Sequence, residues 1–308
     1  MKTRALAVLV IALAVSGMSS ARAQASWVSS GKLAFAASET NEFAFDTGVL
    51  KGKLRAGGKS TGLSSVVHLP TGTRLDHSMG LFGHYRVFSA NRRYGNAAWD
   101  WPSEAKLRPD GSVETYWPSA QDHPFELRAV YRWTAPDTLD LETSVLARTN
   151  LTRFESFLAS YFSESFTNAC VLARLDGSEG LVTADRDSGV WQAFPRDDEA
   201  VSIIKDGRWK FPPSPVDWII RPRLAKPIGL RRCLANNLQV VVMSPPQDCF
   251  AVLTPFDGEG HRSLYPSLFG KDLRAGQTVR ARARLVVGTN PASDAIGPLY
   301  AAYLRQIQ

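Results

Sequence analysis

The chain has 308 residues and a formal net charge of +7 at pH 7. Three of its basic residues and none of its acidic residues lie in the first 23, so the rest of the chain carries a net charge of +4. This charge is mild. It gives no reason to expect a nucleic-acid partner, which needs basic residues gathered on one face, but it permits an acidic polysaccharide as a carbohydrate partner. The length fits one large β domain or two smaller domains.

Residues 1–23 have the pattern of a secretory signal peptide. Lys2 and Arg4 form a basic start, and Ala5–Val15 is an apolar run that is too short to span a bilayer comfortably. Small residues then precede Gln24, where we expect cleavage. The sequence therefore predicts a secreted or periplasmic protein with no membrane span after cleavage. An uncleaved membrane anchor is the alternative.

The chain contains three cysteines, Cys170, Cys233 and Cys249. Cys233 and Cys249 flank a predicted hairpin and are candidates for a disulfide in an exported protein. Reduced, buried cysteines are the alternative. There is no CxxC spacing for zinc, and there is no phosphate loop, dinucleotide fingerprint or calcium loop. We therefore predict no metal and no cofactor.

Alternating apolar and polar residues predict β-strands along most of the chain. In residues 125–133, every second side chain is apolar, and a turn at 135–138 leads into a second alternating run, which indicates a hairpin. Residues 278–288 alternate in the same way. Residues 107–117 and 201–211 each contain an Asp-Gly pair, and we expect a hairpin tip at each pair.

One helix is predicted at the C-terminus, capped by Asp294 and continuing through Ile307 with one apolar stripe. Helical patterns are scarce elsewhere. We therefore predict an all-β chain in which residues 24–308 form a single large antiparallel β-sandwich with a short C-terminal helix. Two small β domains joined at the proline-rich residues 211–218 are the alternative.

The order of elements over residues 131–166 resembles that of galactose mutarotases, also called aldose 1-epimerases. In that family a hairpin ending in a motif like Asn150-Leu151-Thr152 leads into a strand with a Tyr-Phe pair, here Tyr161-Phe162. Residues 273–278 are similar to the turn before the family's last strand. The resemblance implies a galactose mutarotase-like supersandwich, a fold shared with polysaccharide lyase domains. Fold likeness alone does not determine activity.

Two departures from the family concern its catalytic residues. The family's histidine lies two positions before the tyrosine, where this chain has Ala159. The family's late glutamate lies in a strand resembling residues 249–255, which contain no carboxylate. Because mutarotation needs an acid and a base held across the sugar ring, the resemblance implies the fold without the family's ordinary reaction.

Two other side chains of the same strand are candidates for catalysis. Side chains alternate along a strand, so Glu155 and Tyr161 share a face with Ala159. By the resemblance, this face lines the sugar cleft, where Glu155 would be a general base and Tyr161 would exchange a proton with a sugar oxygen. In the alternative interpretation, Tyr161 is a core residue and Glu155 pairs with an arginine.

The segment 256–270 contains the strongest site candidates. Glu259 and His261 are predicted to be catalytic, and Arg262 and Tyr265 are predicted to bind substrate, because this combination suits hydroxyl recognition and proton transfer. A polar turn without a role is the alternative.

Residues 80–102 interleave aromatic side chains with arginines, as sugar-binding grooves do. In this segment His84 is a further catalytic candidate. The predicted substrate-binding residues are Arg86, Arg92, Tyr94 and Trp99. Core packing of the tryptophans is the alternative.

The sequence thus predicts a secreted carbohydrate-active protein that acts on a poly- or oligosaccharide as a lyase or hydrolase. A non-catalytic carbohydrate-binding protein of the cell envelope is the alternative, and a structural envelope protein without a small ligand is a third hypothesis.

Overall fold

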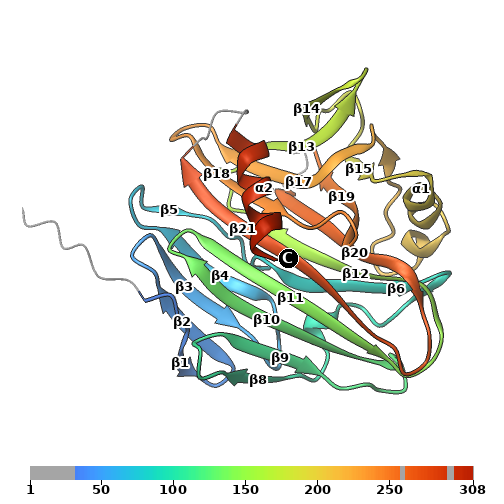
Figure 1. The fold of residues 1–308 in the computed structure, drawn as a ribbon, viewed down its shortest axis with the longest axis horizontal. Coiled ribbons are helices and arrows are strands. Elements are labelled where there is room, and N and C mark those ends of the chain that lie inside the picture. Colours follow the sequence, from blue (N-terminus) through green and yellow to red (C-terminus); the bar gives the residue numbers. More distant parts are fainter. Residues whose placement is uncertain (1–31, 257–260, 290–294, 308) are drawn as a thin grey trace, which may run out of the picture.

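The computed structural model describes residues 32–256, 261–289 and 295–307. The predicted signal peptide, Glu259 and Asp294 lie outside the described residues. Most of the described chain forms three β-sheets (Figure 1), whose neighbouring strands are antiparallel except for one parallel pair, β15 and β16.

The nine- and seven-stranded sheets combine strands from distant parts of the chain, whereas the five-stranded sheet is formed by five consecutive strands. The strands are given below in their spatial order. The five-stranded sheet consists of β1 (Ala36–Glu39), β2 (Glu42–Asp46), β3 (Leu50–Arg55), β4 (Gly62–His68) and β5 (Thr73–Arg74). The nine-stranded sheet consists of β14 (Ser178–Thr183), β13 (Asn168–Leu175), β17 (Leu224–Cys233), β18 (Leu238–Met243), β21 (Thr278–Thr289), β11 (Thr138–Ala147), β10 (Phe125–Ala135), β9 (Val113–Trp117) and β8 (Glu104–Leu107). The seven-stranded sheet consists of β16 (Ile219–Ile220), β15 (Trp191–Pro195), β19 (Cys249–Pro255), β20 (Ser263–Leu273), β12 (Leu151–Tyr161), β6 (Gly83–Ser89) and β7 (Arg92–Arg93). The helices are η1 (Ala98–Asp100), α1 (Asp198–Ile204), η2 (Arg208–Lys210) and α2 (Ile296–Gln306).

The predicted alternation is confirmed in the long strands. Every second residue of β10 from Phe125 to Trp133 is buried, while the side chains between them are partly or fully exposed. β10 pairs with β11 through the predicted turn, and β8 pairs with β9 around Asp110 and Gly111. An apolar face of this kind must be covered by another layer, which is why the sheets pack face to face.

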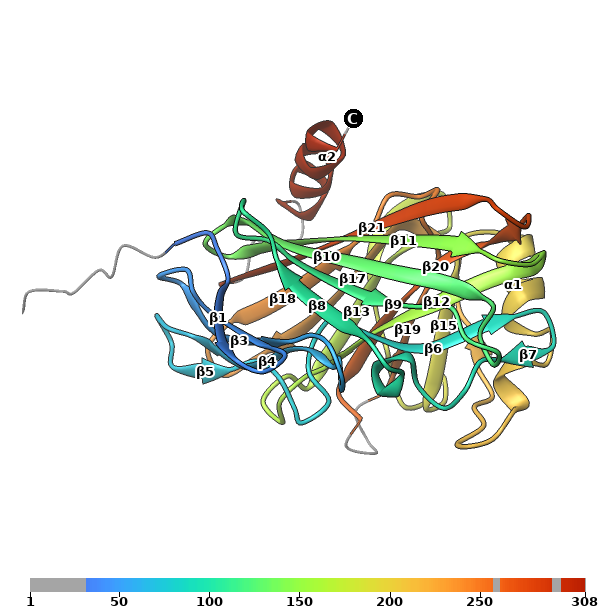
Figure 2. The ribbon, with the colours of Figure 1, turned by 90° about the horizontal axis from the view of Figure 1, so that it is seen from below.

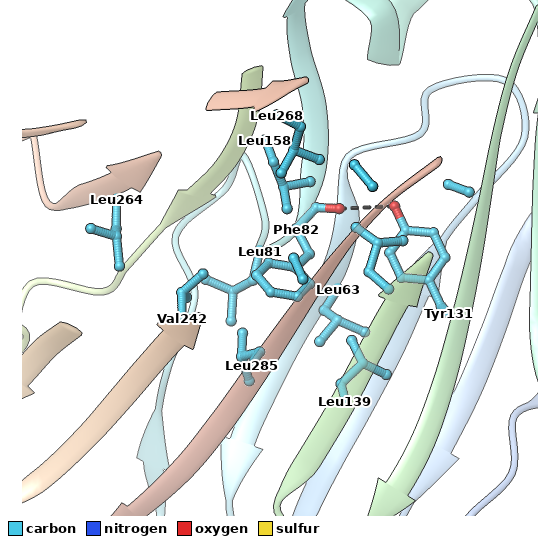
Figure 3. Close-up of a cluster of buried hydrophobic side chains, with 14 of the residues drawn as sticks. Leu63, Leu81, Phe82, Tyr131, Leu139, Leu158, Val242, Leu264, Leu268 and Leu285 are labelled. Atoms are coloured by element: carbon cyan, nitrogen blue, oxygen red, sulfur yellow. Dashed lines mark hydrogen bonds between the residues drawn. The ribbon is translucent and has the colours of Figure 1, made fainter. Parts of the chain in front are cut away.

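The main hydrophobic core lies where the three sheets meet, and Figure 3 shows part of it. Leu63 comes from β4, Leu158 from β12 and Leu285 from β21, and all three side chains are fully or almost fully buried. The Tyr131 hydroxyl donates a 2.8 Å hydrogen bond to the Phe82 carbonyl, so this buried polar group has a partner. Burial of each such leucine contributes about 1.5–3 kcal/mol, and the core therefore joins the three sheets.

The predicted C-terminal helix is confirmed as α2. It lies on the outer side of β21 and β11, away from β6 and β12 (Figure 2). Its buried residues Ile296, Tyr300 and Tyr303 belong to one apolar stripe, which packs against the sheet. No helix in the described part of the chain is long and apolar enough to cross a membrane.

The predicted hairpin over residues 201–211 is wrong, because this segment forms α1, a turn and η2. The Asp197 carboxylate accepts a hydrogen bond from the Ala200 amide and caps α1. Acidic residues in the first turn also favour a helix, and Ile203 and Ile204 bury its apolar side. Gly207, with φ of 98°, does form a turn, but the turn joins two helices.

The disulfide prediction for Cys233 and Cys249 is also wrong, since all three cysteines are free and buried. Cys233 pairs with Leu238, the first residue of β18 in the nine-stranded sheet. Cys249 comes after the loop that follows the last residue of β18, and it begins β19 in the seven-stranded sheet. Six residues of strand at about 3.3 Å each separate the two ends, which far exceeds the reach of a disulfide, roughly 7 Å between Cα atoms.

Candidate functional site

A β-bulge in β6 shapes the outer face of the seven-stranded sheet. Between His84 and Val87, two residues of β6, Tyr85 and Arg86, oppose only Phe157 of β12. Regular alternation would place one of the two side chains on the inner face, whereas a bulge re-aims a side chain. As a result, both Tyr85 and Arg86 line a cavity on the outer face.

This cavity, hereafter the aromatic pocket, has a volume of about 160 Å³. One wall of the pocket consists of side chains from β6, β12, β15 and β20 of the sheet. The opposite wall consists of residues from η2 and from the loop that follows it. The sheet residues are Tyr85, Arg86, Phe157, Tyr161, Trp191 and Tyr265, and those from the facing side are Trp209, 214–216 and Trp218. His261, which precedes β20, completes the lining.

Ring contacts hold the aromatic pocket in shape. Phe157 and Tyr265 stack with ring centroids 4.5 Å apart, and Trp209 meets Trp218 edge to face at 5.3 Å. Tyr85 stacks on Trp99 at 4.3 Å with an interplanar angle of 3°. Because such contacts stabilise particular ring orientations, the pocket is largely pre-formed.

Like the hydroxyls of Tyr85 and Tyr265, the neighbouring groups Tyr161 and His261 of the pocket lining can exchange protons with a ligand. Their ring centroids are 6.3 Å apart, and His261 also lies 5.3 Å from Trp191. Burial raises the pKa of Tyr161 well above its ordinary value, and the neighbouring Tyr265 hydroxyl adds to the shift. Tyr161 is therefore a neutral phenol near pH 7, which suits a proton donor rather than a base.

Arg86 is the cation that lines the pocket. Its side chain is 4% exposed, and its guanidinium lies over the rings of Tyr85 and Trp209, at 5.1 and 5.2 Å from their centroids. One nitrogen, Nη2, donates a 2.8 Å hydrogen bond to the Ser214 carbonyl. The other two, Nε and Nη1, are buried and have no hydrogen-bond partner among the described residues.

Glu155 lies on the predicted strand face but outside the pocket lining, in a buried ion pair. It is 1% exposed and accepts hydrogen bonds from Arg208 at 2.9 Å and from Ser267 at 2.7 Å. Arg208 also bonds to Asp206. Burial raises the pKa of Glu155, and Arg208 opposes this shift. This is the alternative arrangement foreseen for Glu155, and it anchors η2, and with it Trp209, to the sheet.

His84 lies on the inner face of β6 and outside the pocket. It is fully buried, with Nδ1 2.8 Å from the Ser156 hydroxyl and Nε2 3.1 Å from the Thr143 hydroxyl. Burial lowers its pKa to about 3. A neutral histidine with both ring nitrogens occupied inside the core has no access to a ligand, so the catalytic prediction for His84 does not fit its position.

The remaining predicted binding residues do not line the pocket. Trp99 stacks on Tyr85 but is not itself part of the pocket lining. Tyr94 is 2% exposed in the main core, and Arg92 lies over its ring at 4.7 Å. Arg262 accepts a backbone hydrogen bond from the Phe162 amide. Of the predicted site residues, the pocket thus brings together Arg86, Tyr161, His261 and Tyr265.

The sequence analysis missed the three tryptophans of the pocket, Trp191, Trp209 and Trp218. Trp209 shortly precedes the proline-rich residues 211–218, and Trp218 is the last of them; the sequence of this segment suggested only an interdomain joint. Two tryptophans beside such a loop were an available signal. Trp191 has no comparable pattern of residues around it, and nothing in the sequence indicated its role. Within the described ranges, no cluster of His, Cys, Asp or Glu is arranged to hold a metal ion.

No protein-family model matches this sequence, and no curated protein is similar to it. Solved structures show that its β-sheet architecture is a known one. The Slr1438 protein from Synechocystis sp. PCC 6803 superimposes with a TM-score of 0.52 and 12% identity, over 84% of this chain and 99% of that one. A galactose mutarotase-like protein from Lactobacillus casei superimposes with a TM-score of 0.50 and 8% identity, over 80% of this chain and all of that one. The protein therefore has a galactose mutarotase-like fold, as its sequence predicts. At these identities the likeness concerns the fold alone.

Proposed function

We propose that this protein is a carbohydrate-active protein that takes a sugar residue into the aromatic pocket. The observation that carries the proposal is the composition of the lining: aromatic rings on both sides, with the hydroxyls of Tyr161 and Tyr265 and the imidazole of His261 between them. Aromatic rings pack against the apolar C–H faces of a sugar, and polar groups at fixed positions recognise its hydroxyls. A largely pre-formed pocket lowers the entropy cost of binding.

The size of the aromatic pocket limits what it can enclose. Its volume of about 160 Å³ is below the ~300–1,000 Å³ of pockets that surround drug-sized ligands. It therefore suits one residue of a poly- or oligosaccharide, with the rest of the ligand outside. A signal peptide, as the sequence predicts, would take the protein to the compartment where such polymers are found.

Among the reactions predicted from the sequence, the geometry favours β-elimination over hydrolysis. Glycoside hydrolysis generally uses two carboxylic groups that flank the scissile bond. None of the described lining residues carries a carboxylate, and the nearby Glu155 is held by Arg208 and Ser267. Glu259 remains a candidate on sequence grounds only. A β-elimination needs a base and an acid but no carboxylate pair.

In a β-elimination at a uronate residue, His261 would accept the proton from C5. The bond between C4 and its glycosidic oxygen would break, a double bond would form between C4 and C5, and Tyr161 would donate its proton to the departing oxygen. Tyr161 is protonated near pH 7, and since its raised pKa makes it a weak acid, it would donate its proton only to a strongly basic group such as the departing alkoxide. The same pocket without turnover would serve the alternative function, a non-catalytic carbohydrate-binding protein.

A polysaccharide panel tests the proposal. Purified protein is incubated with neutral and uronate-containing polymers, and reactions are followed for unsaturated products absorbing in the ultraviolet and for new reducing ends. Binding is measured in parallel by calorimetry. We expect the protein to bind at least one of the polymers and, if it is a lyase, to release products that absorb in the ultraviolet. Trp218→Ala should decrease both the binding and the product formation. His261→Ala and Tyr161→Phe should abolish the product formation.

Each other outcome has a definite meaning. Binding without products supports the non-catalytic alternative. Reducing ends without ultraviolet absorbance, lost in Glu259→Gln, would indicate hydrolysis. The absence of binding to every polymer, or binding unchanged in Trp218→Ala, would contradict the proposed function.

A further inference from the structure

The buried guanidinium of Arg86 is not satisfied by the protein around it. A buried polar donor without a partner costs about 1–3 kcal/mol, and more when it is charged. Arg86 has two such nitrogens, Nε and Nη1. The described residues that line the pocket include no carboxylate to neutralise its charge.

Another buried arginine, on the helix that faces this side of the sheet, has its charge neutralised by carboxylates. Arg208 is fully buried, and each of its nitrogens donates to a carboxylate, with Glu155 and Asp206 as the partners. Arg86 differs from it in having one carbonyl acceptor, Ser214, and two ring faces. Rings attract a cation but do not accept its N–H hydrogen bonds in the way an oxyanion does.

The position of Arg86 depends on a specific backbone feature. The β-bulge opposite Phe157 puts Arg86 on the same face as Tyr85 and into the pocket. Bulges are frequent next to functional sites, where they re-aim a side chain. An arginine brought into a largely aromatic pocket by a bulge, with two donors that have no partner among the described residues, has the features of an anion receptor.

We infer that Arg86 is the specificity-determining residue of the aromatic pocket and that the pocket takes an anionic sugar residue, one bearing a carboxylate or sulfate group. This inference rests on the proposed function, since it assumes that the pocket binds a sugar. Arginine matches the geometry of carboxylate and sulfate groups, and a hydrogen bond to a charged partner is about twice as strong as a neutral one. Low polarity around the guanidinium strengthens the interaction further.

Binding of matched ligands tests the inference. Four sets of ligands are titrated into the wild-type protein and into Arg86→Gln. They are oligosaccharides of galacturonate and glucuronate, the methyl esters of these oligosaccharides, a sulfated neutral oligosaccharide, and the corresponding neutral oligosaccharides. We expect the acidic ligands to bind the wild-type protein about ten- to a hundredfold more tightly than their esters or neutral counterparts. This preference should disappear in Arg86→Gln, because the acidic ligands should lose much more affinity than their neutral counterparts do.

Arg128→Gln is the matched control. Arg128 lies over the Tyr116 ring at 4.1 Å on the nine-stranded sheet, far in the topology from the pocket, and its replacement removes the same charge. It should retain the preference for acidic ligands. Loss of the preference in Arg128→Gln as well would show a general charge effect and would overturn the inference.

Two further results would overturn the inference while leaving the proposed function in place. One is equal binding of acidic and neutral oligosaccharides, with Trp218→Ala weakening both. The other is an acid preference that persists in Arg86→Gln. Free acetate or sulfate binding as tightly as the acidic sugars would also overturn it, because the site would then recognise an anion without a sugar. Failure of all sugars to bind would contradict the proposed function itself.

Discussion

His84 and Arg86 are two positions apart on β6, and both are almost completely buried. The two ring nitrogens of His84 lie within hydrogen-bond distance of the hydroxyls of Ser156 and Thr143. Arg86 bonds only to the Ser214 carbonyl and leaves two nitrogens without a partner among the described residues. Histidine would have been the more obvious catalytic residue, but its hydrogen bonds are used by the core. The difference indicates that His84 contributes to the fold, and it is the reason for proposing a ligand for Arg86.

The bulge between these two residues is the physical cause of the difference. It turns Arg86 outward to the aromatic pocket, while His84 stays with the inner face of the sheet. Native proteins satisfy most buried polar groups, so an exception that is placed in a pocket is evidence for a site. The following experiments test whether the three buried groups of this region, Arg208, His84 and Arg86, differ in the way their contacts suggest.

The largest effect is expected for Arg208→Met, which leaves Glu155 buried without its counter-ion. Breaking a buried ion pair from one side costs about 3–5 kcal/mol. Both side chains of this pair are at most 1% exposed. Urea unfolding measures the loss, with Arg128→Met as the exposed control, for which we expect a change of about 1 kcal/mol or less. Equal losses in the two variants would show that the Glu155–Arg208 pair is not a special anchor.

A second, smaller effect concerns His84 and pH. Its pKa is about 3 in the folded protein and ordinarily about 6.5 when unfolded, so between these values the unfolded state binds the extra proton. Stability should therefore fall as the pH drops below about 6.5, by up to roughly 1.4 kcal/mol per pH unit from this group. His84→Gln should lower the stability at pH 7 by about 1–3 kcal/mol and reduce this slope.

Urea titrations between pH 7 and 4 measure the His84 effect. The exposed His77 provides the control, because His77→Gln should leave both the stability and the slope near those of the wild type. An unchanged slope in His84→Gln would mean that this histidine becomes protonated without leaving the core.

The third experiment tests the other side of the comparison. Arg86→Met removes two buried donors without partners and one hydrogen bond to Ser214. Removing the unpartnered donors should stabilise the protein, whereas losing the hydrogen bond should destabilise it. We therefore expect the free energy of unfolding to change by about 1 kcal/mol or less. The preference for acidic ligands should be lost. Thermal and urea unfolding measure the change in stability. A loss above about 2 kcal/mol would identify Arg86 as a structural residue like Arg208.

The smallest effect is expected from reduction. All three cysteines are free in the structure, so a reducing agent should leave the melting temperature unchanged, and a thiol assay in denaturant without reductant should find three thiols per chain. Burial raises the pKa of Cys249 to about 12, which should make this thiol unreactive in the folded protein. Fewer than three thiols would indicate a disulfide that the structure does not contain.

Part of the site was predictable because strand alternation is a local property. The period of two predicted that Tyr161 shares the strand face that lines the pocket, the interleaved aromatic residues and arginines of 80–102 pointed to Arg86, and the cluster in 256–270 pointed to His261 and Tyr265. The same rule predicts opposite faces for adjacent residues, and for this reason it could not foresee the bulge that puts Tyr85 and Arg86 together.

Other predictions failed where the outcome depends on distant partners. Whether Glu155 is a base or half of an ion pair depends on Arg208, which lies 53 positions later in the chain. The hairpin predicted over residues 201–211 failed because the Asp-Gly signal is compatible with any turn, whereas the cap at Asp197 and the burial of Ile203 against the sheet favour a helix.

The sequence by itself determined most strands of this protein, its C-terminal helix and its antiparallel β-sandwich, because alternation and turn residues act over a few positions. The mutarotase-like form of the sandwich was implied by the resemblance of residues 131–166 and 273–278 to that family. The tertiary structure decided which buried polar groups are satisfied. That depends on which strands become neighbours and where a register shift occurs, and it separates His84 in the core from Arg86 in the aromatic pocket.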